Sequence, residues 1–181
     1  FVKSKGLSTP RIKQRSNNTL ILEYLQLQQS KKYLPKLAEH IALFHNNNIN
    51  NQSEFHYDNY HGTLFLSNAH CDNWVEFFKI TRWMPIVEHL KNKNLLDVAV
   101  LATKVSDIMD KLFPVDPFVC LLHGDFHRDN WGYANDKVYV FDPTPLYGHN
   151  EYELASMDCF YMPTKEFIDT YHSIIPKHEK L

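Results

Sequence analysis

A short apolar segment in the last third of the chain is followed by a loop rich in carboxylate and amide side chains. After Val119–Leu122, Asp125 and Asn130 lie five positions apart, and Asp142 follows twelve residues later, where a second apolar segment ends. Transfer of a phosphoryl group needs a carboxylate to accept the hydroxyl proton and ligands to hold Mg²⁺ on the phosphates. Magnesium takes a few hard oxygen ligands and keeps water and phosphate in its other positions. This set of residues therefore predicts phosphoryl-transfer chemistry.

Two apolar segments are expected to hold these side chains in place. Val119–Leu122 and Val138–Phe141 have the composition of strands and flank the polar loop. We expect the two strands to form a hairpin-type arrangement, with Asp125, Asn130 and Asp142 at its loop ends. The spacing Asp-x4-Asn is that of a kinase catalytic loop. Each feature alone arises often by chance, but their combination with a strand on both sides favours a kinase.

The remaining segments predict a mixed α+β chain in which helices dominate. Apolar residues recur at helical spacing in three segments: Tyr33–Phe44, Trp74–Leu90 with a break near Pro85, and Leu95–Leu112. The β-branched and apolar run Thr19–Leu25 predicts a buried strand, and Phe1–Ser4 has the composition of the end of a strand. The asparagine-rich residues 45–53 predict an exposed loop.

Composition argues against several classes of protein. The 181 residues are 44% hydrophobic, which suffices for the core of about one domain. The net charge of −2 argues against nucleic acid or an anionic membrane as the main partner, because both need a basic face. The apolar stretches are too short to span a membrane. The three cysteines form no CxxC pair, so we expect no disulfide scaffold or zinc–cysteine site, and a reducing, cytoplasmic setting.

Three motifs together resemble the fructosamine (ketosamine) kinase family. They are His123–Asn130, Phe141–Pro143 and Tyr147–Ala155, and the last, Tyr-Gly-His-x-Glu-Tyr-Glu-Leu-Ala, is the most specific. The likeness extends over residues 19–176. The family is grouped with the aminoglycoside and choline phosphotransferases, so the resemblance implies a two-lobed, protein-kinase-like fold. It implies that residues 1–25 are a remnant of the small N-terminal sheet lobe and hinge, and that residues 26–181 form the mostly helical C-terminal lobe.

The resemblance also implies a role for each matching position. Asp125 would be the catalytic base, and Asn130 and Asp142 would hold Mg²⁺. Nucleotide contacts would come from the strand lysine, Lys3, on the ATP phosphates and from the backbone of the hinge on the adenine: Glu23, Tyr24 and Leu25. Substrate contacts would come from His127 and Asn59. His123 would orient the catalytic loop, and Glu153 would brace it.

The activity implied by the resemblance is transfer of the γ-phosphate of ATP to a sugar hydroxyl of a ketosamine or glycated amine, a reaction of protein-deglycation type. The sequence departs from the family pattern at the catalytic loop, which reads Asp-Phe-His-Arg-Asp-Asn where the family usually has Asp-Leu-Trp-Ser-Gly-Asn. No glycine-rich loop precedes Lys3, and no acidic residue lies between Lys3 and Glu23. The short interval from Lys3 to Leu20 means either that the small lobe is degenerate or that residues are missing from this chain, and we expect the second.

Two alternatives come from other classes of protein. A kinase-like binding module without catalytic activity is favoured by the absence of the glycine-rich loop and of an acidic partner for Lys3. A metal-dependent phosphoesterase is suggested by the crowding of four potential metal ligands in one loop: His123, Asp125, His127 and Asp129.

Overall fold

The chain forms two compact units and passes from one to the other several times. The structure is a computed structural model that describes residues 2–50, 55–113, 117–159 and 163–177. The first unit contains the described residues up to Asn48, the segment His123–Pro143 and the described residues of Glu151–Lys177. The second contains the described residues of Ile49–Leu122 and the segment Thr144–Asn150. The lobe boundary expected at residue 25 stays a prediction.

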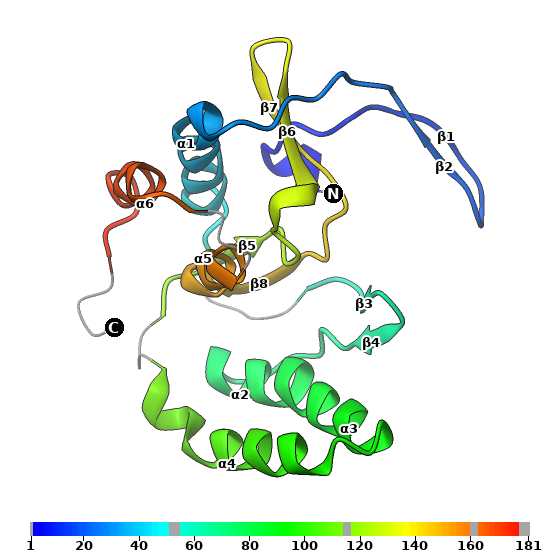
Figure 1. The fold of residues 1–181 in the computed structure, drawn as a ribbon, viewed down its shortest axis with the longest axis vertical. Coiled ribbons are helices and arrows are strands. Elements are labelled where there is room, and N and C mark those ends of the chain that lie inside the picture. Colours follow the sequence, from blue (N-terminus) through cyan, green and yellow to red (C-terminus); the bar gives the residue numbers. More distant parts are fainter. Residues whose placement is uncertain (1, 51–54, 114–116, 160–162, 178–181) are drawn as a thin grey trace. The chain divides into compact units, whose positions relative to one another are not determined.

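The first unit is built around helix α1. In chain order, its elements are η1 (Val2–Lys5), β1 (Ile12–Arg15), β2 (Leu20–Leu22), η2 (Lys31–Tyr33), α1 (Leu34–Asn46), η4 (Arg128–Asn130), β6 (Trp131–Ala134), β7 (Lys137–Val140), α5 (Asn150–Cys159) and α6 (Lys165–His172). The first residue of α5 belongs to the second unit. Helices α1 and α6 lie side by side (Figure 1).

Helix α1 confirms the helix expected from apolar spacing. Its buried residues recur every three or four positions: Leu34, Leu37, Ala38, Ile41, Ala42, Phe44 and His45. Pro35 stands in the first turn, where its missing N–H removes no helical hydrogen bond. The buried face packs against α6, which contributes Phe167 and Tyr171. The helix runs through His45 to Asn46, so His45 belongs to this buried face and not to the expected loop.

Strands β6 and β7 form a tight hairpin. Ala134 pairs with Lys137 across the two residues Asn135 and Asp136, both of which have positive φ, 49° and 60°. Two residues of this conformation form the turn that matches the twist of paired strands. The pairing expected between Val119–Leu122 and Val138–Phe141 is therefore wrong. A two-residue turn pairs β7 with its neighbour in sequence before a more distant strand can compete.

The second unit contains the other strands and three helices. Its elements are β3 (Asn59–His61), β4 (Leu64–Leu66), α2 (Trp74–Phe78), the π-helical turn η3 (Lys79–Trp83), α3 (Met84–Asn92), α4 (Leu96–Leu112), β5 (Val119–Leu122) and β8 (Leu146–His149). Strand β5 pairs antiparallel with β8. Gly148 is required in β8, because a Cβ there would lie 2.5 Å from the buried ring of Trp74.

The expected helices of this unit are confirmed, and the break before Pro85 has a local cause. Proline has no N–H, so in a regular helix it would leave the carbonyl of Thr81 without its partner. The guanidinium of Arg82 donates to that carbonyl at 3.1 Å. The Thr81 hydroxyl donates to Phe77 O at 2.7 Å. Side chains thus supply hydrogen bonds where the helix widens into the π turn.

Two expectations for the N-terminal segment are wrong. Val2–Lys5 is a 3₁₀ helix and not a strand end, and Phe1 lies outside the described residues. The segment Thr19–Leu25 is not a buried strand: β2 covers only Leu20–Leu22, and Leu20 is 56% exposed. Strands β1 and β2 form a two-stranded sheet, which buries little unless another layer packs on it. The hairpin extends away from the rest of its unit (Figure 1).

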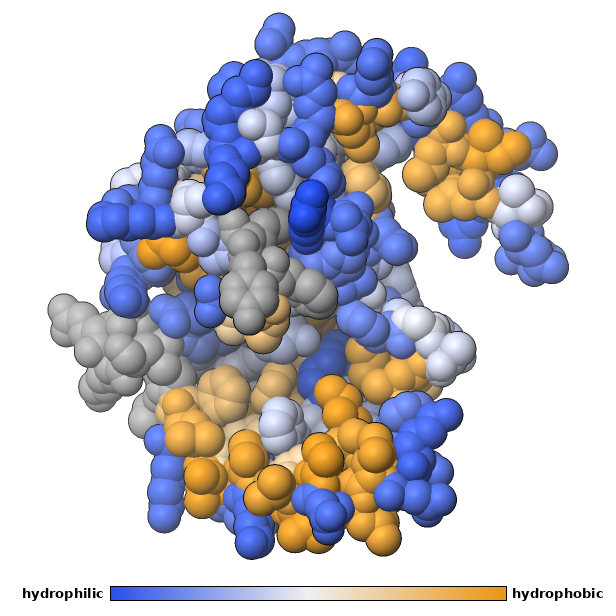
Figure 2. Space-filling model, viewed as in Figure 1, coloured by the Kyte–Doolittle hydropathy of each residue, from blue (hydrophilic) through white to orange (hydrophobic). Residues whose placement is uncertain are grey.

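Hydrophobic residues gather at the surface in two places, over the β1–β2 hairpin and over α3 and α4 (Figure 2). Leu96, Leu101 and Ile108 are exposed on α4. None of the helices in the described parts of the chain combines the length and the apolar composition that a membrane span requires. Residues 51–54 of the expected loop lie outside the described residues.

Candidate active site

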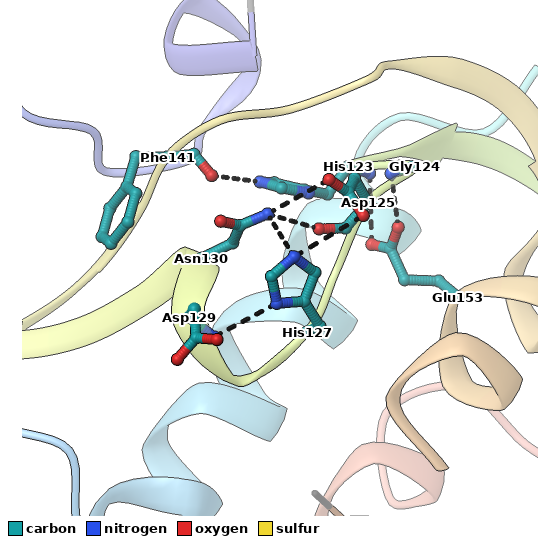
Figure 3. Close-up of polar contacts among 8 residues, drawn as sticks. All are labelled: His123, Gly124, Asp125, His127, Asp129, Asn130, Phe141 and Glu153. Carbon is teal, nitrogen blue, oxygen red and sulfur yellow. Dashed lines mark hydrogen bonds and ion pairs between the residues drawn. The ribbon is translucent and has the colours of Figure 1, made fainter. Parts of the chain in front are cut away.

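The carboxylate of Glu153 binds the backbone at the start of the polar loop. This residue of α5 is buried, and its carboxylate accepts hydrogen bonds from the backbone N–H groups of His123 at 3.1 Å and Gly124 at 2.7 Å (Figure 3). Burial alone would raise the pKa of Glu153. The hydrogen bond and the electrostatic interaction with His45, with smaller contributions from His123 and Gly124 N–H, outweigh burial and lower the pKa of Glu153. Glu153 is therefore an ionised carboxylate anchored beneath the loop.

His123 ties the loop to the end of β7. Its Nε2 lies 2.9 Å from the carbonyl oxygen of Phe141, and because a carbonyl only accepts, Nε2 carries the proton. Burial lowers the pKa of His123, against the opposing effects of Glu153, the bond to Phe141, Asp125 and Asp142. A neutral ring in this position orients the loop. The carboxylates of Asp125 and Asp142 both lie near enough to His123 to act on its pKa.

Asn130 closes the loop onto Asp125. Its Nδ2 donates to the backbone oxygen of Asp125 at 2.8 Å and lies 3.4 Å from Asp125 Oδ2. The backbone N–H of Phe141 donates to Asn130 O at 3.0 Å, which joins the loop to the residue before Asp142. With Nδ2 engaged, Oδ1 of Asn130 is left to accept or to bind a cation. The Asp125 side chain is 22% exposed, so a substrate hydroxyl can reach it.

His127 lies beside Asp125 (Figure 3). Its Nδ1 accepts a hydrogen bond from the backbone N–H of Asp129 at 3.2 Å. Its Nε2 lies 3.7 Å from Asp125 Oδ1 and 3.1 Å from Asn130 Nδ2. The structure therefore brings five of the predicted residues together: His123, Asp125, His127, Asn130 and Glu153.

A cleft of about 700 Å³ lies within the first unit and contains two more of the predicted residues, Lys3 and Asp142. One wall is apolar and comes from the hairpin: Ile12, Leu20 and Leu22. Phe141 and Pro143 line the cleft on either side of Asp142 in the chain, and Asp142 has a φ of 56°, in the left-handed region that aspartate tolerates better than most residues. A cation and a carboxylate thus share a cleft with an apolar wall.

Of the predicted hinge residues, Tyr24 is exposed, and Glu23 and Leu25 are partly buried. Glu23 N–H donates to Arg11 O at 2.8 Å, and the Glu23 carboxylate accepts from Arg11 N at 2.9 Å and Arg11 Nε at 2.8 Å. These hydrogen bonds, with a smaller effect of the Lys3 charge, lower the pKa of Glu23. Tyr24 is 89% exposed. Among the described residues that line the cleft, Leu22 is present but Glu23, Tyr24 and Leu25 are not.

Asn59 lies in the second unit. It is buried, and its Nδ2 donates to the carbonyl oxygen of Pro145 at 2.6 Å. Its role as a substrate contact stays a prediction.

The loop does not gather its potential metal ligands in the way that a phosphoesterase needs. Within the described residues, no three His, Cys, Asp or Glu side chains form a group that could hold a metal ion. His123 faces Phe141 O, and Asp129 is exposed. The phosphoesterase alternative therefore loses the observation on which it depended.

Sequence reasoning missed two residues beneath the loop. His45 and Tyr171 are buried, and the Tyr171 hydroxyl lies 2.8 Å from His45 Nδ1. The available signal was a histidine four positions after Ile41 on the apolar face of α1. Nothing in the spacing of Tyr171 distinguishes it from an ordinary core aromatic residue.

Comparison with known proteins gives a consistent result. The profile of the family described as fructosamine kinase matches residues 8–181. The chain is 35% identical to a ketosamine-3-kinase from Mus musculus over 121 residues, which cover 64% of this chain and 38% of that protein. It is 26% identical to a protein named probable ketoamine kinase from Pasteurella multocida, over 91% of this chain and 57% of that protein. The chain thus spans about half the length of these relatives, or less.

Two solved structures share the fold. One, from Haemophilus somnus, carries the provisional name fructosamine-3-kinase and matches with a TM-score of 0.83 and 23% identity over 98% of this chain and 62% of that one. The other, from Thermobifida fusca and with the same provisional name, matches with a TM-score of 0.86 and 24% identity over 99% of this chain and 65% of that one. The α+β, protein-kinase-like fold class expected from the sequence is confirmed.

Proposed function

Because this chain belongs to the fructosamine kinase family, we propose that it transfers the γ-phosphate of ATP to a sugar hydroxyl of a ketosamine, a small molecule or a glycated amine. The proposal includes the deglycation-type role and the cytoplasmic setting expected from the sequence. The observation that carries it is the arrangement around Asp125. A partly exposed carboxylate lies beside an amide oxygen, on a loop tied through Phe141 to a second carboxylate, Asp142.

Asp125 is the proposed catalytic base. The substrate hydroxyl oxygen attacks the γ-phosphorus, and its proton passes to a carboxylate oxygen of Asp125. The new oxygen–phosphorus bond forms as the bond between the γ-phosphorus and the β,γ-bridging oxygen breaks, and ADP leaves with that oxygen. The side-chain amide of Asn130, which donates to Asp125 O, and the bond from Gly124 N–H to Glu153 hold Asp125 in place while this occurs. Positioning of this kind is the main contribution that a protein makes to phosphoryl transfer.

The donor set fits magnesium. Oδ1 of Asn130 and the carboxylate of Asp142 are hard oxygen ligands, and they are the residues that would hold Mg²⁺. When bound, Mg²⁺ neutralises charge on the phosphates. The bond from Asn130 Nδ2 to Asp125 O fixes the side of the amide that carries Oδ1.

The cleft beside Asp142 is the proposed nucleotide site. Its apolar wall of Ile12, Leu20 and Leu22 suits a base, and Lys3 provides a positive charge for the phosphates. The backbone of Glu23–Leu25 is proposed to contact the adenine edge. His127 is proposed to contact the acceptor sugar, since its Nε2 lies beside the Asp125 carboxylate that receives the proton.

The test is a pair of aspartate-to-asparagine variants in one loop. ADP release is measured with ATP, Mg²⁺ and fructosyl-lysine, with fructose as the acceptor control. Asp125→Asn is expected to lower kcat by about 10²–10⁴-fold, the usual contribution of a general base. Asp129→Asn, an exposed change four residues on, is expected to keep activity. Equal activity of the two variants would remove Asp125 from the mechanism.

A binding module without transfer is the second candidate. It is supported by the position of Lys3, which lies exposed on a 3₁₀ helix. The Glu23 carboxylate, whose pKa the Lys3 charge helps to lower, is held by Arg11. This candidate predicts weak or no binding of ATP, as judged by calorimetry, and ADP release with fructosyl-lysine equal to the background rate. Turnover that depends on Asp125 would exclude it.

A further inference from the structure

A buried chain of hydrogen bonds connects two helices to the backbone of the catalytic loop. The Tyr171 hydroxyl lies 2.8 Å from His45 Nδ1, and His45 Nε2 lies 3.1 Å from Glu153 Oε1. The two oxygens of Glu153 also accept from His123 N–H and Gly124 N–H. The three side chains that form these hydrogen bonds, Tyr171, His45 and Glu153, are all buried.

Donor and acceptor chemistry fixes the direction of the hydrogen bonds to Glu153. The ionised Glu153 only accepts, so His45 Nε2 carries a proton and donates. Nδ1 of the same ring forms the second hydrogen bond, with the Tyr171 hydroxyl. In this arrangement every hydrogen bond has one donor and one acceptor. Glu153 receives three N–H groups, one of them from the residue immediately before Asp125.

These hydrogen bonds also join segments that are distant in sequence. His45 lies near the end of α1, Glu153 is on α5 and Tyr171 is on α6. Tyr171 is 126 residues from His45, and His45 is 108 residues from Glu153. A buried polar group without its partner is costly, so the three side chains keep their positions only together.

We infer that His45 and Tyr171 are positioning residues that act through Glu153 on the loop carrying Asp125. The inference rests on the proposed role of Asp125 as base. Without the Tyr171 hydroxyl, Nδ1 of His45 loses the hydrogen-bond partner that holds the ring, and the ring no longer presents Nε2–H firmly to Glu153. Glu153 then holds Gly124 N–H less tightly, and the neighbouring Asp125 loses its fixed position.

The first test follows the Gly124 amide directly. Hydrogen exchange is measured by NMR for the whole chain, wild type and Tyr171→Phe, with the amide of Leu37 in α1 as a reference for global unfolding. Loss of one buried hydrogen bond is expected to speed Gly124 exchange by about tenfold relative to Leu37. The matched control is Tyr133→Phe, which removes a hydroxyl that accepts from Lys36 Nζ at 2.8 Å, and it should leave Gly124 unchanged. Unchanged Gly124 exchange in Tyr171→Phe, or equal acceleration of Leu37, overturns the inference.

A double-mutant cycle tests whether the effect passes through His45. In His45→Gln, the amide can still donate to Glu153 but has no group in the place of Nδ1 to bond the Tyr171 hydroxyl. Tyr171→Phe should therefore have no further effect on Gly124 exchange in this background. A second acceleration of about tenfold would show a separate route and overturn the inference.

Kinetics separate this inference from the proposed function. Tyr171→Phe should lower kcat by about tenfold, with KM for ATP unchanged, because the base and not the nucleotide is displaced. A change in KM alone would contradict a positioning role. If the wild type transfers no phosphate to fructosyl-lysine, the proposed function fails, whereas the exchange of Gly124 still decides whether His45 and Tyr171 hold the loop.

Discussion

Two regions of the first unit, the catalytic loop and the β1–β2 hairpin, contribute to the proposed site by different physical means. The loop is held from α1, β7 and α5 through buried groups, with Glu153 and His123 at the centre. The hairpin is a two-stranded sheet with exposed apolar residues, connected at its base through Arg11 and Glu23. The proposed chemistry therefore depends on the interior, and the proposed nucleotide cleft depends partly on the surface.

Two glutamates make this difference concrete. Both Glu153 and Glu23 accept several hydrogen bonds, and both have a lowered pKa. Arg11 is exposed, so water and salt screen its attraction for Glu23. Glu153 and His45 are fully buried, where removal of one partner leaves the other uncompensated. Similar hydrogen-bond patterns thus contribute very different amounts to the free energy of unfolding.

The largest effect is expected from Glu153→Gln. The new amide group would oppose one of the three N–H donors around it, so the free energy of unfolding should fall by about 3–5 kcal/mol, the cost of breaking a buried pair. Glu23→Gln, the same change at the hairpin, should leave the free energy of unfolding unaltered. Urea unfolding of both variants measures this contrast. Equal losses would mean that burial does not distinguish the two regions.

The next largest effect concerns Asp142, which lines the cleft. ATP with Mg²⁺ at about 100 times Kd should stabilise the wild type by about 2.7 kcal/mol, and Asp142→Asn should remove most of this stabilisation. Asparagine tolerates the positive φ of Asp142, so the change removes charge without adding strain. Thermal unfolding with and without Mg·ATP measures it. Full stabilisation of the variant would show that Asp142 does not hold the metal.

A smaller effect is expected where the chain leaves the hairpin. A Cβ at Gly132 of β6 would lie 2.7 Å from Leu27 Cβ, next to the Gln28–Tyr133 bridge. Gly132→Ala should therefore cost about 1–3 kcal/mol in unfolding free energy, as overpacking does. The NMR spectrum should change at residues 27–28 and not at Gly124. Changes centred on Gly124 would mean that the two regions are coupled through β6.

The smallest effect is a dependence on pH. Burial lowers the pKa of His123 and of His40, so both side chains bind protons more weakly when folded. The stability that they contribute is complete above the unfolded pKa of about 6.5 and is lost as pH falls below it. Glu153 adds a further loss below its ordinary value of 4.5. Urea unfolding at pH 7.5 and 5.5 should show lower stability at the lower pH.

His40→Gln identifies part of this pH dependence. His40 Nε2 accepts from Ser8 N–H at 3.3 Å, where α1 meets the segment before the hairpin, and a glutamine oxygen can accept in its place without titrating. The variant should lose less stability between pH 7.5 and 5.5 than the wild type. An equal loss in both proteins would assign the whole effect to other groups.

Several features could be predicted because they depend on neighbouring residues. Apolar periodicity predicted α1 and α4, and Pro85 marked the region of the helix break. The Asp-x4-Asn spacing predicted that Asp125 and Asn130 would meet, because a loop of six residues keeps its ends close. The motif Tyr147–Ala155 pointed to Glu153, and the structure places it under the loop. Their proposed roles stay predictions.

Tertiary structure alone decided the rest. The sequence by itself determined which helix faces are apolar and which polar side chains share one loop, since both follow from spacing along the chain. It did not determine that β5 pairs with β8, that β1 and β2 form a two-stranded sheet with exposed apolar residues, or that Tyr171 and His45 meet beside Glu153. Partners more than a hundred residues apart are chosen by the packing of whole helices. No local pattern records that choice.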